Sequence, residues 1–267
     1  MDFLIELGRS KKLQIIERLR ERSMSLKELA DSNGLSISTV SRNVKWLCNR
    51  GILYKHKRKC KLTGFGVAVE KLLRVLVDIE RIKEDIRDLP DFIDFLPPEI
   101  IAGAHLLNRC RVMSVEEALN IGLSYLIRSE KYGLYIDKII DYDIYKMMVL
   151  KNLEGVSERV ISTRSTILDR TSTFRRALMD LDLSEKELDI VADKVQIRIY
   201  DTPIQLGVID GKIGILQLND RIDRIYVSDD EDFIRWCEYF FWFLWRKSEP
   251  VDVKKIIEEI KARKGFS

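Results

Sequence analysis

The sequence is poor in the residues that build metal centres and disulfide frameworks. Among 267 residues it has two histidines, His56 and His105, and four cysteines. The cysteines are Cys48, Cys60, Cys110 and Cys237, and no two of them form a CxxC pair. A zinc site or a disulfide scaffold needs clustered ligands or paired thiols, so neither is supported. We expect no metal, no cofactor and a reducing, cytoplasmic environment.

Long hydrophobic runs are also missing. The longest run of aromatic and aliphatic residues is Phe240–Trp245, whereas a membrane-spanning helix needs about twenty residues. Asp2 and Glu6 precede any basic residue, which is not the pattern of a signal peptide. We therefore expect no membrane partner. With 46% hydrophobic and 33% charged residues, the chain has the composition of a folded protein of about two domains.

Positive charge is concentrated in the first quarter of the chain. Residues 1–66 hold fifteen Lys and Arg against six Asp and Glu, a net charge of +9. Because the whole chain carries +3, the remainder carries −6. A small basic segment before a mildly acidic body indicates a polyanion-binding module attached to a regulatory or assembly domain.

The first fifty residues predict three short helices. Apolar residues at helical spacing indicate a first helix over residues 10–22. Ser25 followed by Glu28 is a capping-box signature for a second helix, which ends at an Asn-Gly pair. Ser36 caps a third helix that lasts to about residue 50, before Gly51.

The third helix has two faces of different chemistry. Val40, Val44 and Leu47 fall on one face, which predicts its core side. The opposite face carries hydroxyls, cations and an amide. An α-helix fits the DNA major groove, where Arg and Lys reach guanine, Asn pairs with adenine and Ser contacts phosphate or base edges. The predicted DNA-binding residues of this segment are Ser36, Ser38, Ser41, Arg42, Lys45 and Asn49.

Residues 53–62 read L-Y-K-H-K-R-K-C-K-L, apolar at both ends and basic in the middle. We interpret this run as a tight β-hairpin, or wing. A helix, a glycine-containing turn, a Ser-rich helix and a basic hairpin, in this order, are typical of a winged helix-turn-helix. Lys57, Arg58 and Lys59 at the wing tip complete the predicted DNA-binding set, and double-stranded DNA is the expected partner.

The next segment is expected to be a helical linker. Between Phe65 and about Asp88, apolar residues are spaced by threes, fours and one seven, as in a two-stranded helix seam. An amphipathic helix that packs on its own domain gives the same pattern. Three prolines between residues 90 and 98 mark a boundary. The predicted parts are a DNA-binding domain (1–68), a linker (69–98) and an effector or dimerisation domain (99–267).

The larger domain alternates predicted strands and helices, which is typical of an α/β domain. Asp210-Gly211 between two strands predicts a hairpin, so part of the sheet is antiparallel. The expected fold is therefore α+β or α/β: a winged helix-turn-helix, a helical linker and a mixed α/β sheet domain. Strands are predicted over 133–142, 157–163, 195–200, 204–209, 212–218 and 225–227, and helices over 99–128, 144–153, 173–181, 184–193, 229–246 and 253–262.

Polar residues at three predicted strand ends suggest an effector site. Ligands of α/β domains tend to bind beyond the carboxyl ends of parallel strands. A cation, hydroxyls and carboxylates at these ends would suit a small polar or anionic metabolite. The alternative is that these ends are polar only because they meet water. The predicted effector-binding residues are Asp141, Tyr142, Thr163, Arg164, Asp201 and Thr202.

Several segments resemble known regulators. The segments LKELA (26–30), GLSISTVSR (34–42), LCNRGIL (47–53) and KLTGFG (61–66) resemble winged-helix regulators of bacteria and archaea. VSERVIST (156–163), IDGKIGIL (209–216) and DFIRWCEYFFWFLW (232–245) resemble the effector domain of archaeal methanogenesis-type regulators, which has a phospholipase-D-like core. The H-x-K motif of active phospholipases is missing, because Leu106 and Leu107 follow His105. The resemblance implies an archaeal transcriptional regulator with a binding domain rather than an esterase.

Three functions remain open. The first is a ligand-responsive transcription factor that works as a homodimer, because one recognition helix reads only a few base pairs. Its interface would be the helix over 65–86 or the aromatic helix over 232–245. The second is a constitutive architectural DNA binder. The third is a nucleic-acid-directed enzyme, which no phosphate loop or nucleophile–base pair supports; its phosphorylated substrate would contact Arg159, Arg164, Ser165, Arg170 and Arg175.

Two further features have a functional and a structural interpretation. An aromatic binding cage is conceivable on the helix over 232–245, although a core or dimer face is commoner. Cys48 and Cys60 could form a redox switch, although inert free thiols are commoner. The cage would consist of Trp236, Tyr239, Phe240 and Phe243.

Overall fold

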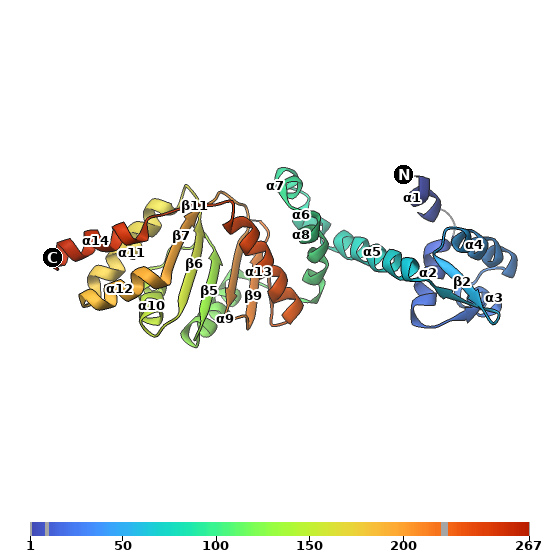
Figure 1. Ribbon diagram of the computed structural model, residues 1–267, viewed down its shortest axis with the longest axis horizontal. Coiled ribbons are helices and arrows are strands. Elements are labelled where there is room, and N and C mark those ends of the chain that lie inside the picture. Colours follow the sequence, from blue (N-terminus) through green and yellow to red (C-terminus); the bar gives the residue numbers. More distant parts are fainter. Residues whose placement is uncertain (1, 9–10, 220–223, 267) are drawn as a thin grey trace. The chain divides into compact units, whose positions relative to one another are not determined.

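The chain folds into two compact units, residues 1–80 and 81–267 (Figure 1). The computed structural model describes residues 2–8, 11–219 and 224–266. The fold class is the predicted one, with a helical N-terminal unit that carries a small hairpin and a C-terminal mixed α/β unit. The predicted linker over 69–98 is divided between the units: Val69 is buried in the first core and Leu96 in the second.

The N-terminal unit contains the predicted helix–turn–helix and wing, together with two elements that the sequence did not predict. The unpredicted elements are α1 (Asp2–Gly8) and β1 (Met24–Ser25). The others are α2 (Lys12–Glu21), α3 (Leu26–Asn33), α4 (Ile37–Asn49), β2 (Leu53–His56), β3 (Lys59–Leu62) and α5 (Gly64–Arg81). Residue 10, the predicted start of the first helix, lies outside the described residues. Strands β1, β3 and β2 form a small antiparallel sheet.

Local capping fixes the two helices of the helix–turn–helix. Ser25 Oγ accepts the Glu28 N–H at 3.2 Å, and a Glu28 carboxylate oxygen accepts the Ser25 N–H at 2.7 Å. This reciprocal box confirms the predicted start of α3. Gly34 ends the helix with φ +61°, a left-handed backbone that glycine adopts without strain.

The contacts at the start of α5 explain why the segment K-L-T-G-F-G contains a threonine and a glycine at fixed positions. Thr63 Oγ1 accepts the Gly66 N–H at 2.9 Å and donates to the Gly51 carbonyl at 2.6 Å. A Cβ at Gly66 would lie 2.1 Å from the Ile52 carbonyl oxygen. Glycine at this position therefore lets α5 pack directly on the chain that enters the wing.

The C-terminal unit begins with short helices and contains one large sheet. The helices are α6 (Lys83–Ile86), α7 (Pro90–Phe95), α8 (Pro98–Gly103), η1 (Ala104–Arg109), α9 (Val115–Ile127), α10 (Tyr142–Leu153), α11 (Ile167–Asp180), α12 (Glu185–Lys194), α13 (Glu231–Trp245) and α14 (Val253–Lys264). The strands are β4 (Arg111–Met113), β5 (Tyr132–Ile136), β6 (Ser157–Ser162), β7 (Val195–Ile199), β8 (Gln205–Ile209), β9 (Ile213–Gln217), β10 (Ile225–Ser228) and β11 (Glu249–Pro250).

The sheet mixes parallel and antiparallel pairs. Its strand order among the described residues is β11-β7-β6-β5-β8-β9-β10-β4, and only β5, β6 and β7 pair in parallel. The predicted β8–β9 hairpin is confirmed, with Asp210 at φ +54° and Gly211 at φ +64°. Because β5, β6 and β7 run in the same direction, the residues that follow them meet at one edge of the sheet.

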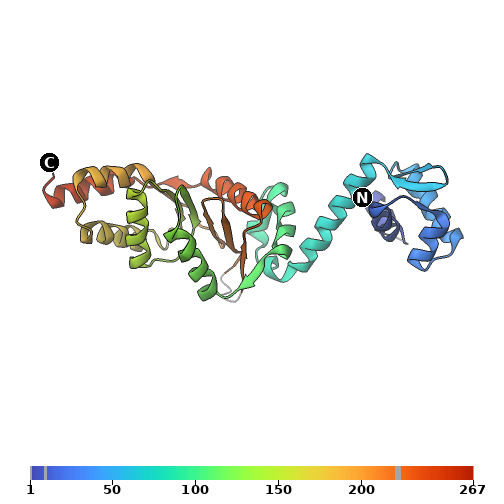
Figure 2. The same ribbon diagram turned by 90° about the horizontal axis from the view of Figure 1, so that it is seen from below.

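Helices cover both faces of this sheet (Figures 1 and 2). On one face, α13 packs with α8 over apolar side chains of β5, β8 and β9, such as Leu134 and Val208. On the other face, α10, α11, α12 and α14 pack over Val160 of β6 and Ile197 of β7. Helix α9 covers the same side near Ile209. The strands are thus positioned between two layers of helices.

Three predicted boundaries were wrong, and one of them is the strand predicted over 133–142, which ends at Ile136. The helix predicted over 99–128 contains a strand, β4, which pairs with β10 through Val112 and Tyr226. This pairing partner lies more than a hundred residues away, so a local pattern could not reveal it. Helix α11 starts at Ile167 rather than at residue 173. Within the described residues, no helix is long and apolar enough to cross a membrane.

Candidate nucleic-acid interface

Helix α4 separates its side chains as the sequence predicted. Val40, Val44 and Leu47 are fully buried in the core of the N-terminal unit. The opposite side of the helix is exposed at Ser38, Arg42, Lys45 and Asn49 and half-buried at Ser41. The buried side holds the helix in place, so the two cations and the amide stand together on the outer face.

The helix start is ordered by its own hydroxyls. Ser36 is the N-cap: its Oγ accepts the Thr39 N–H at 3.2 Å and lies 2.9 Å from Ser38 Oγ. Asn43 is buried, and its amide donates to the Thr39 carbonyl at 3.0 Å. Ser36 therefore caps the N-terminal end of α4. Backbone N–H groups at this end of a helix are available to an anion.

The wing presents its cations at a tight two-residue turn. Lys57 and Arg58 both have positive φ, +45° and +65°, as in the turn type that matches hairpin twist. Along β3, Cys60 and Leu62 are buried while Lys59 and Lys61 are exposed. The strand alternation thus places the wing's positive charge in solvent.

The exposed cations of this unit have few acidic neighbours. Within the part of the chain that the structure describes, the cations of the α4 outer face and the wing tip are among those that form no salt bridge. They are Arg42, Lys45, Lys57, Arg58 and Lys59. Unpaired exposed cations on a helix face and a hairpin tip are available to phosphate oxygens and base edges.

An aromatic stack on α4 was missed at the sequence level. Trp46 stacks on Phe3 of α1 with ring centroids 6.3 Å apart. Lys12 Nζ lies 4.8 Å from the Trp46 centroid, and the Arg50 guanidinium lies 5.3 Å from it. These two cations are therefore held against the protein by a ring face. The run F-L-I-E-L near the start of the chain was the available signal for α1.

The two cysteines of this unit show no sign of activation. Cys48 and Cys60 are both free thiols. Burial raises the pKa of each thiol above its usual value, which disfavours the reactive thiolate.

The predicted effector residues do not form one site. Thr163, Arg164 and Asp201 lie together at the carboxyl ends of β6 and β7, where the Arg164 N–H donates to Asp201 Oδ1 at 2.8 Å. The Arg164 guanidinium donates to both Glu249 carboxylate oxygens, at 2.8 and 3.2 Å. Thr202 is buried, and its hydroxyl accepts the Ile204 N–H at 3.4 Å. The charge of Arg164 is therefore already matched by two carboxylates.

Asp141 and Tyr142 lie elsewhere. Asp141 is the N-cap of α10, with its Oδ1 accepting the Ile144 N–H at 3.0 Å. The Tyr142 hydroxyl donates to Asp180 in the last turn of α11, whereas Thr163 precedes the first turn of that helix. The sequence reasoning failed here because it placed these two residues at the end of a strand, and β5 ends at Ile136.

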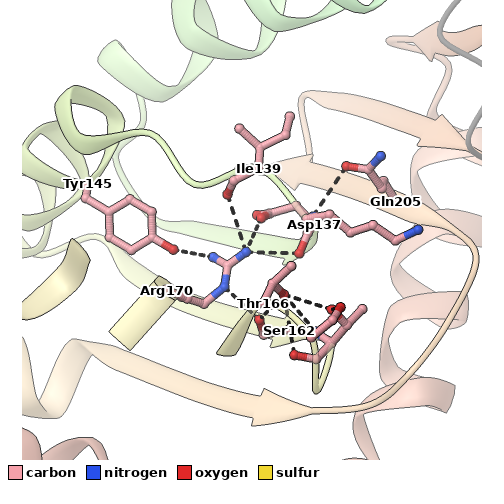
Figure 3. Close-up of polar contacts among 10 residues, drawn as sticks. Asp137, Ile139, Tyr145, Ser162, Thr166, Arg170 and Gln205 are labelled. Carbon is pink, nitrogen blue, oxygen red and sulfur yellow. Dashed lines mark hydrogen bonds and ion pairs between the residues drawn. The ribbon is translucent and has the colours of Figure 1, made fainter. Parts of the chain in front are cut away.

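A buried arginine organises the same edge of the sheet (Figure 3). The Arg170 side chain is 2% exposed. Its guanidinium donates to Ser162 Oγ at 2.9 Å, to the Tyr145 hydroxyl, and to both the carboxylate and the carbonyl of Asp137. A weaker contact reaches the Ile139 carbonyl at 3.4 Å. Arg170 thus joins the ends of β5 and β6 to α10 and α11, and each of its three guanidinium nitrogens donates at least one hydrogen bond.

The other predicted phosphate-binding arginines are also engaged, and they do not converge. Arg175 pairs with Glu259 of α14. Arg159 lies over the Trp242 ring, 5.4 Å from its centroid. Ser165 Oγ is within 2.9 Å of Thr163 Oγ1. Within the described residues, no group of His, Cys, Asp and Glu could hold a metal ion.

The aromatic helix α13 belongs to the core, and the cage hypothesis was wrong. Trp236 and Phe240 are buried, and the Trp236 indole N–H donates to the Ile100 carbonyl at 3.0 Å. Phe243 packs against Phe95 with centroids 5.4 Å apart, while Tyr239 is exposed. The four rings do not enclose a common space because three of them pack against the sheet face, α7 and α8.

An apolar cavity of about 160 Å³ lies in the second unit, on the sheet face that α9 and α10 cover. Of the six predicted effector residues, only Asp141 lines it. Its walls come from Leu119 and Leu123 of α9 and from Met148 of α10. Such residues look like ordinary core in the sequence, so no local pattern could have indicated a cavity here.

Comparison with known proteins gives one family match, and it covers the N-terminal unit. Residues 1–84 match the family described as "HVO_A0261 N-terminal domain". No curated protein sequence matches the chain.

Solved structures give distant likenesses. The archaeal chromatin protein TrmBL2 is 16% identical, with 94% of this chain and 99% of that chain covered and a TM-score of 0.42. NucT from Helicobacter pylori is 11% identical, with 51% and 92% covered and a TM-score of 0.37. An O-methyltransferase family protein from Burkholderia thailandensis is 8% identical, with 75% and 64% covered and a TM-score of 0.27. All three TM-scores are below 0.5, so these likenesses establish neither a fold nor a function.

Proposed function

We propose that this protein is a DNA-binding transcriptional regulator that acts as a homodimer and responds to a small ligand through its C-terminal unit. One observation carries the DNA-binding part. Two exposed cations on α4 and three at the wing form no salt bridge within the described residues, and they lie on a helix–turn–helix with a basic hairpin. In such modules the second helix enters the major groove, and the wing contacts the backbone or the minor groove.

The N-terminal sequence and its family match suit this proposal. The segments that resemble winged-helix regulators form the helices, turn and hairpin of one unit, and the family match covers the same residues. The archaeal source, the methanogenesis-regulator type and the phospholipase-D-like core stay predictions from the resemblance. TrmBL2 is described as an archaeal chromatin protein with a novel mode of DNA binding, and a constitutive architectural role stays the alternative for this chain.

The homodimer is supported by α5. Leu72 and Leu76 of this helix are 64% and 60% exposed, whereas Val69 is buried against its own unit. The first half of α5 therefore packs against the N-terminal unit through Val69. Further along the helix, Leu72 and Leu76 leave apolar surface exposed. The alternative interface on α13 is weakened because most of the apolar side chains of that helix are buried within the unit. The proposal includes no catalytic step.

The test separates base reading from backbone contact. Operator DNA is selected from a random pool with the full chain, and binding to the selected and a scrambled duplex is measured by fluorescence anisotropy. We expect Arg42→Ala to reduce the preference for the selected duplex by roughly tenfold or more, as loss of a bidentate base contact does. Arg58→Ala should weaken binding to both duplexes equally.

Lys186→Ala serves as the control, because it removes one exposed positive charge from α12, outside the proposed interface. It should leave both affinities unchanged. An Arg42→Ala protein that still discriminates the two duplexes as well as the parent would refute the recognition face. No binding of the parent to any duplex would refute DNA binding altogether.

A further inference from the structure

The cavity beneath α9 and α10 combines an apolar body with one polar end. Its apolar lining includes Leu119, Leu123, Ile144, Met148 and Ile215. Asp137, Asp141, Arg170 and Gln205 line it as well. These four come from the end of β5, the start of α10, α11 and the start of β8. A molecule that entered would therefore meet apolar side chains along most of its surface and polar groups at one place.

The polar end disfavours an anion. Arg170 is the cation among the four polar residues above, and its guanidinium is already bound by Asp137, Tyr145 and Ser162 (Figure 3). Asp137 and Asp141 are both lining residues of the cavity, and each carries a carboxylate. A bound carboxylate or phosphate would face these two negative charges without a cation available to neutralise it.

The same end offers acceptors to a donor. Asp141 Oδ1 accepts one backbone N–H, and Asp137 Oδ1 accepts from Arg170. A carboxylate has about four acceptor positions, so each retains capacity for a further bond. The Gln205 amide already makes two hydrogen bonds: its Nε2 donates to Gln217 Oε1 at 2.9 Å, and its Oε1 accepts the Lys138 N–H at 3.4 Å.

Tyr135 supplies a second, independent observation. This residue lines the cavity, and its hydroxyl is buried without a hydrogen-bond partner within the described residues. A buried hydroxyl that lacks a partner carries a desolvation cost that a bound polar group can offset. This hydroxyl lies over Gly133 at the start of β5, so the cavity wall has an unsatisfied polar atom close by in addition to the acceptors beyond the end of β5.

We propose that this cavity binds a small amphipathic molecule with an apolar body of about one ring and a single hydrogen-bond-donating head, either an ammonium or a hydroxyl group. The volume of about 160 Å³ accommodates roughly six to eight non-hydrogen atoms, since an apolar cavity of about 150 Å³ holds a benzene molecule. The inference rests on the proposed ligand response of the C-terminal unit and names its ligand class and site.

Three isosteric probes test the head group: benzylamine, benzyl alcohol and benzoate. Each is titrated into the full-length protein while the unfolding temperature is recorded by scanning fluorimetry. At about ten times the dissociation constant, benzylamine and benzyl alcohol should raise the unfolding temperature by about 2–4 °C in a saturable manner. Benzoate should produce no shift. Equal stabilisation by benzoate would overturn the assigned head group, and no stabilisation by any probe would overturn the site.

Gly207→Val tests the location. A Cβ at Gly207 would meet Ile215 and Tyr135 at 3.9 Å, which is ordinary contact, and valine suits a strand. Its methyl groups would occupy the cavity, so the response to both stabilising probes should disappear. Leu150→Val on the exposed side of α10 is the matched control and should respond like the parent. A Gly207→Val protein that keeps the full response would place the ligand elsewhere.

Asp141→Asn tests the polar end with a variant that keeps the helix cap, because asparagine caps α10 as well as aspartate does. It should weaken benzylamine binding several-fold and leave benzyl alcohol binding nearly unchanged. Equal effects on both probes would contradict a role for the Asp141 charge. DNA affinity is measured on the same preparations: DNA binding without probe binding refutes only this cavity, and probe binding without DNA binding refutes only the proposed regulator.

Discussion

At the scale of single residues, the buried polar groups of the C-terminal unit do the most to define its structure. Asp210 is an example, since its carboxylate accepts three backbone N–H groups, from residues 130, 131 and 132, at 2.9–3.0 Å. Burial acts to raise the pKa of Asp210, but these hydrogen bonds outweigh it and hold the pKa below its usual value. One side chain thus fixes the start of β5 against the β8–β9 hairpin.

Glu158 is the opposite case. It is buried on β6 beside Asn152 of α10, and burial raises the pKa of its carboxyl to about 8. The buried Glu158 Oε1 and Asn152 Oδ1 have no hydrogen-bond partner within the described residues. Burial favours the neutral carboxyl group, and this effect outweighs the Asn152 hydrogen bond, which acts to lower the pKa of Glu158.

This pKa predicts a pH-dependent stability. Between the unfolded value near 4.5 and about 8, the folded protein binds more protons than the unfolded chain, so the free energy of unfolding falls as pH rises. The fall should be on the order of 1 kcal/mol per pH unit. Glu158→Gln is neutral at every pH and should lose this contribution, which urea unfolding at pH 5, 6, 7 and 8 will measure.

Glu116→Gln is the control, because Glu116 of α9 is exposed. Its free energy of unfolding should equal that of the parent at each pH. A Glu158→Gln protein whose unfolding free energy changes with pH as steeply as that of the parent would show that Glu158 is charged in the folded state.

At the scale of elements, α5 combines both alternatives that the sequence left open. Its first turns are fixed by Thr63 and Gly66 and pack on the N-terminal unit. Beyond Glu70, large apolar side chains such as Leu72 and Leu76 are exposed. A helix that packs one apolar side on its own unit and exposes further apolar side chains is suited to pair with the same helix of a second copy of the chain.

Pairing through α5 predicts that polar substitutions will separate the subunits. Leu72→Ser combined with Leu76→Ser should weaken dimerisation by about a hundredfold or more, because each buried leucine contributes roughly 1.5–3 kcal/mol. Sedimentation velocity at micromolar concentration should then show a monomer where the parent is a dimer. The matched control is Leu168→Ser, because Leu168 of α11 is 78% exposed. The protein with this substitution should stay dimeric. A monomeric parent would refute the homodimer itself.

At the scale of the whole molecule, charge is divided between the two units. Residues 1–80 carry +8 and residues 81–267 carry −5. This division concentrates attraction for DNA in the N-terminal unit and leaves the larger unit without a general affinity for polyanions.

A charge-driven interface predicts a strong dependence of DNA binding on salt. Phosphate contacts by Lys and Arg release counterions. If each N-terminal unit of the homodimer makes about four such contacts, affinity should fall by about ten-thousandfold between roughly 50 and 200 mM salt. Lys57→Ala combined with Arg58→Ala removes two cations from each subunit, so it should lower the slope of log affinity against log salt by about four in the homodimer. An affinity that does not change over this range would contradict the assignment of these cations to phosphate.

The sequence by itself determined the helix–turn–helix and the wing of the N-terminal unit, but not α1 and β1. Its signals are local: the capping residues Ser25 and Ser36, Gly34 between the helices and the alternation of the wing all act within about four residues. The recognition face follows from the helical period once the buried side is known. The fold class of the C-terminal unit and its β8–β9 hairpin were also readable, because strand and turn patterns are local as well.

Only the tertiary structure decided where the polar and apolar residues of the C-terminal unit meet. Arg170 reaches Asp137, Tyr145 and Ser162 across 8 to 33 residues of chain, and β4 finds β10 across more than a hundred. Contacts at such separations are set by how helices and strands pack, and several packings share the same local pattern. The cavity between α9 and the sheet is therefore a property of the fold that no segment of the sequence contains alone.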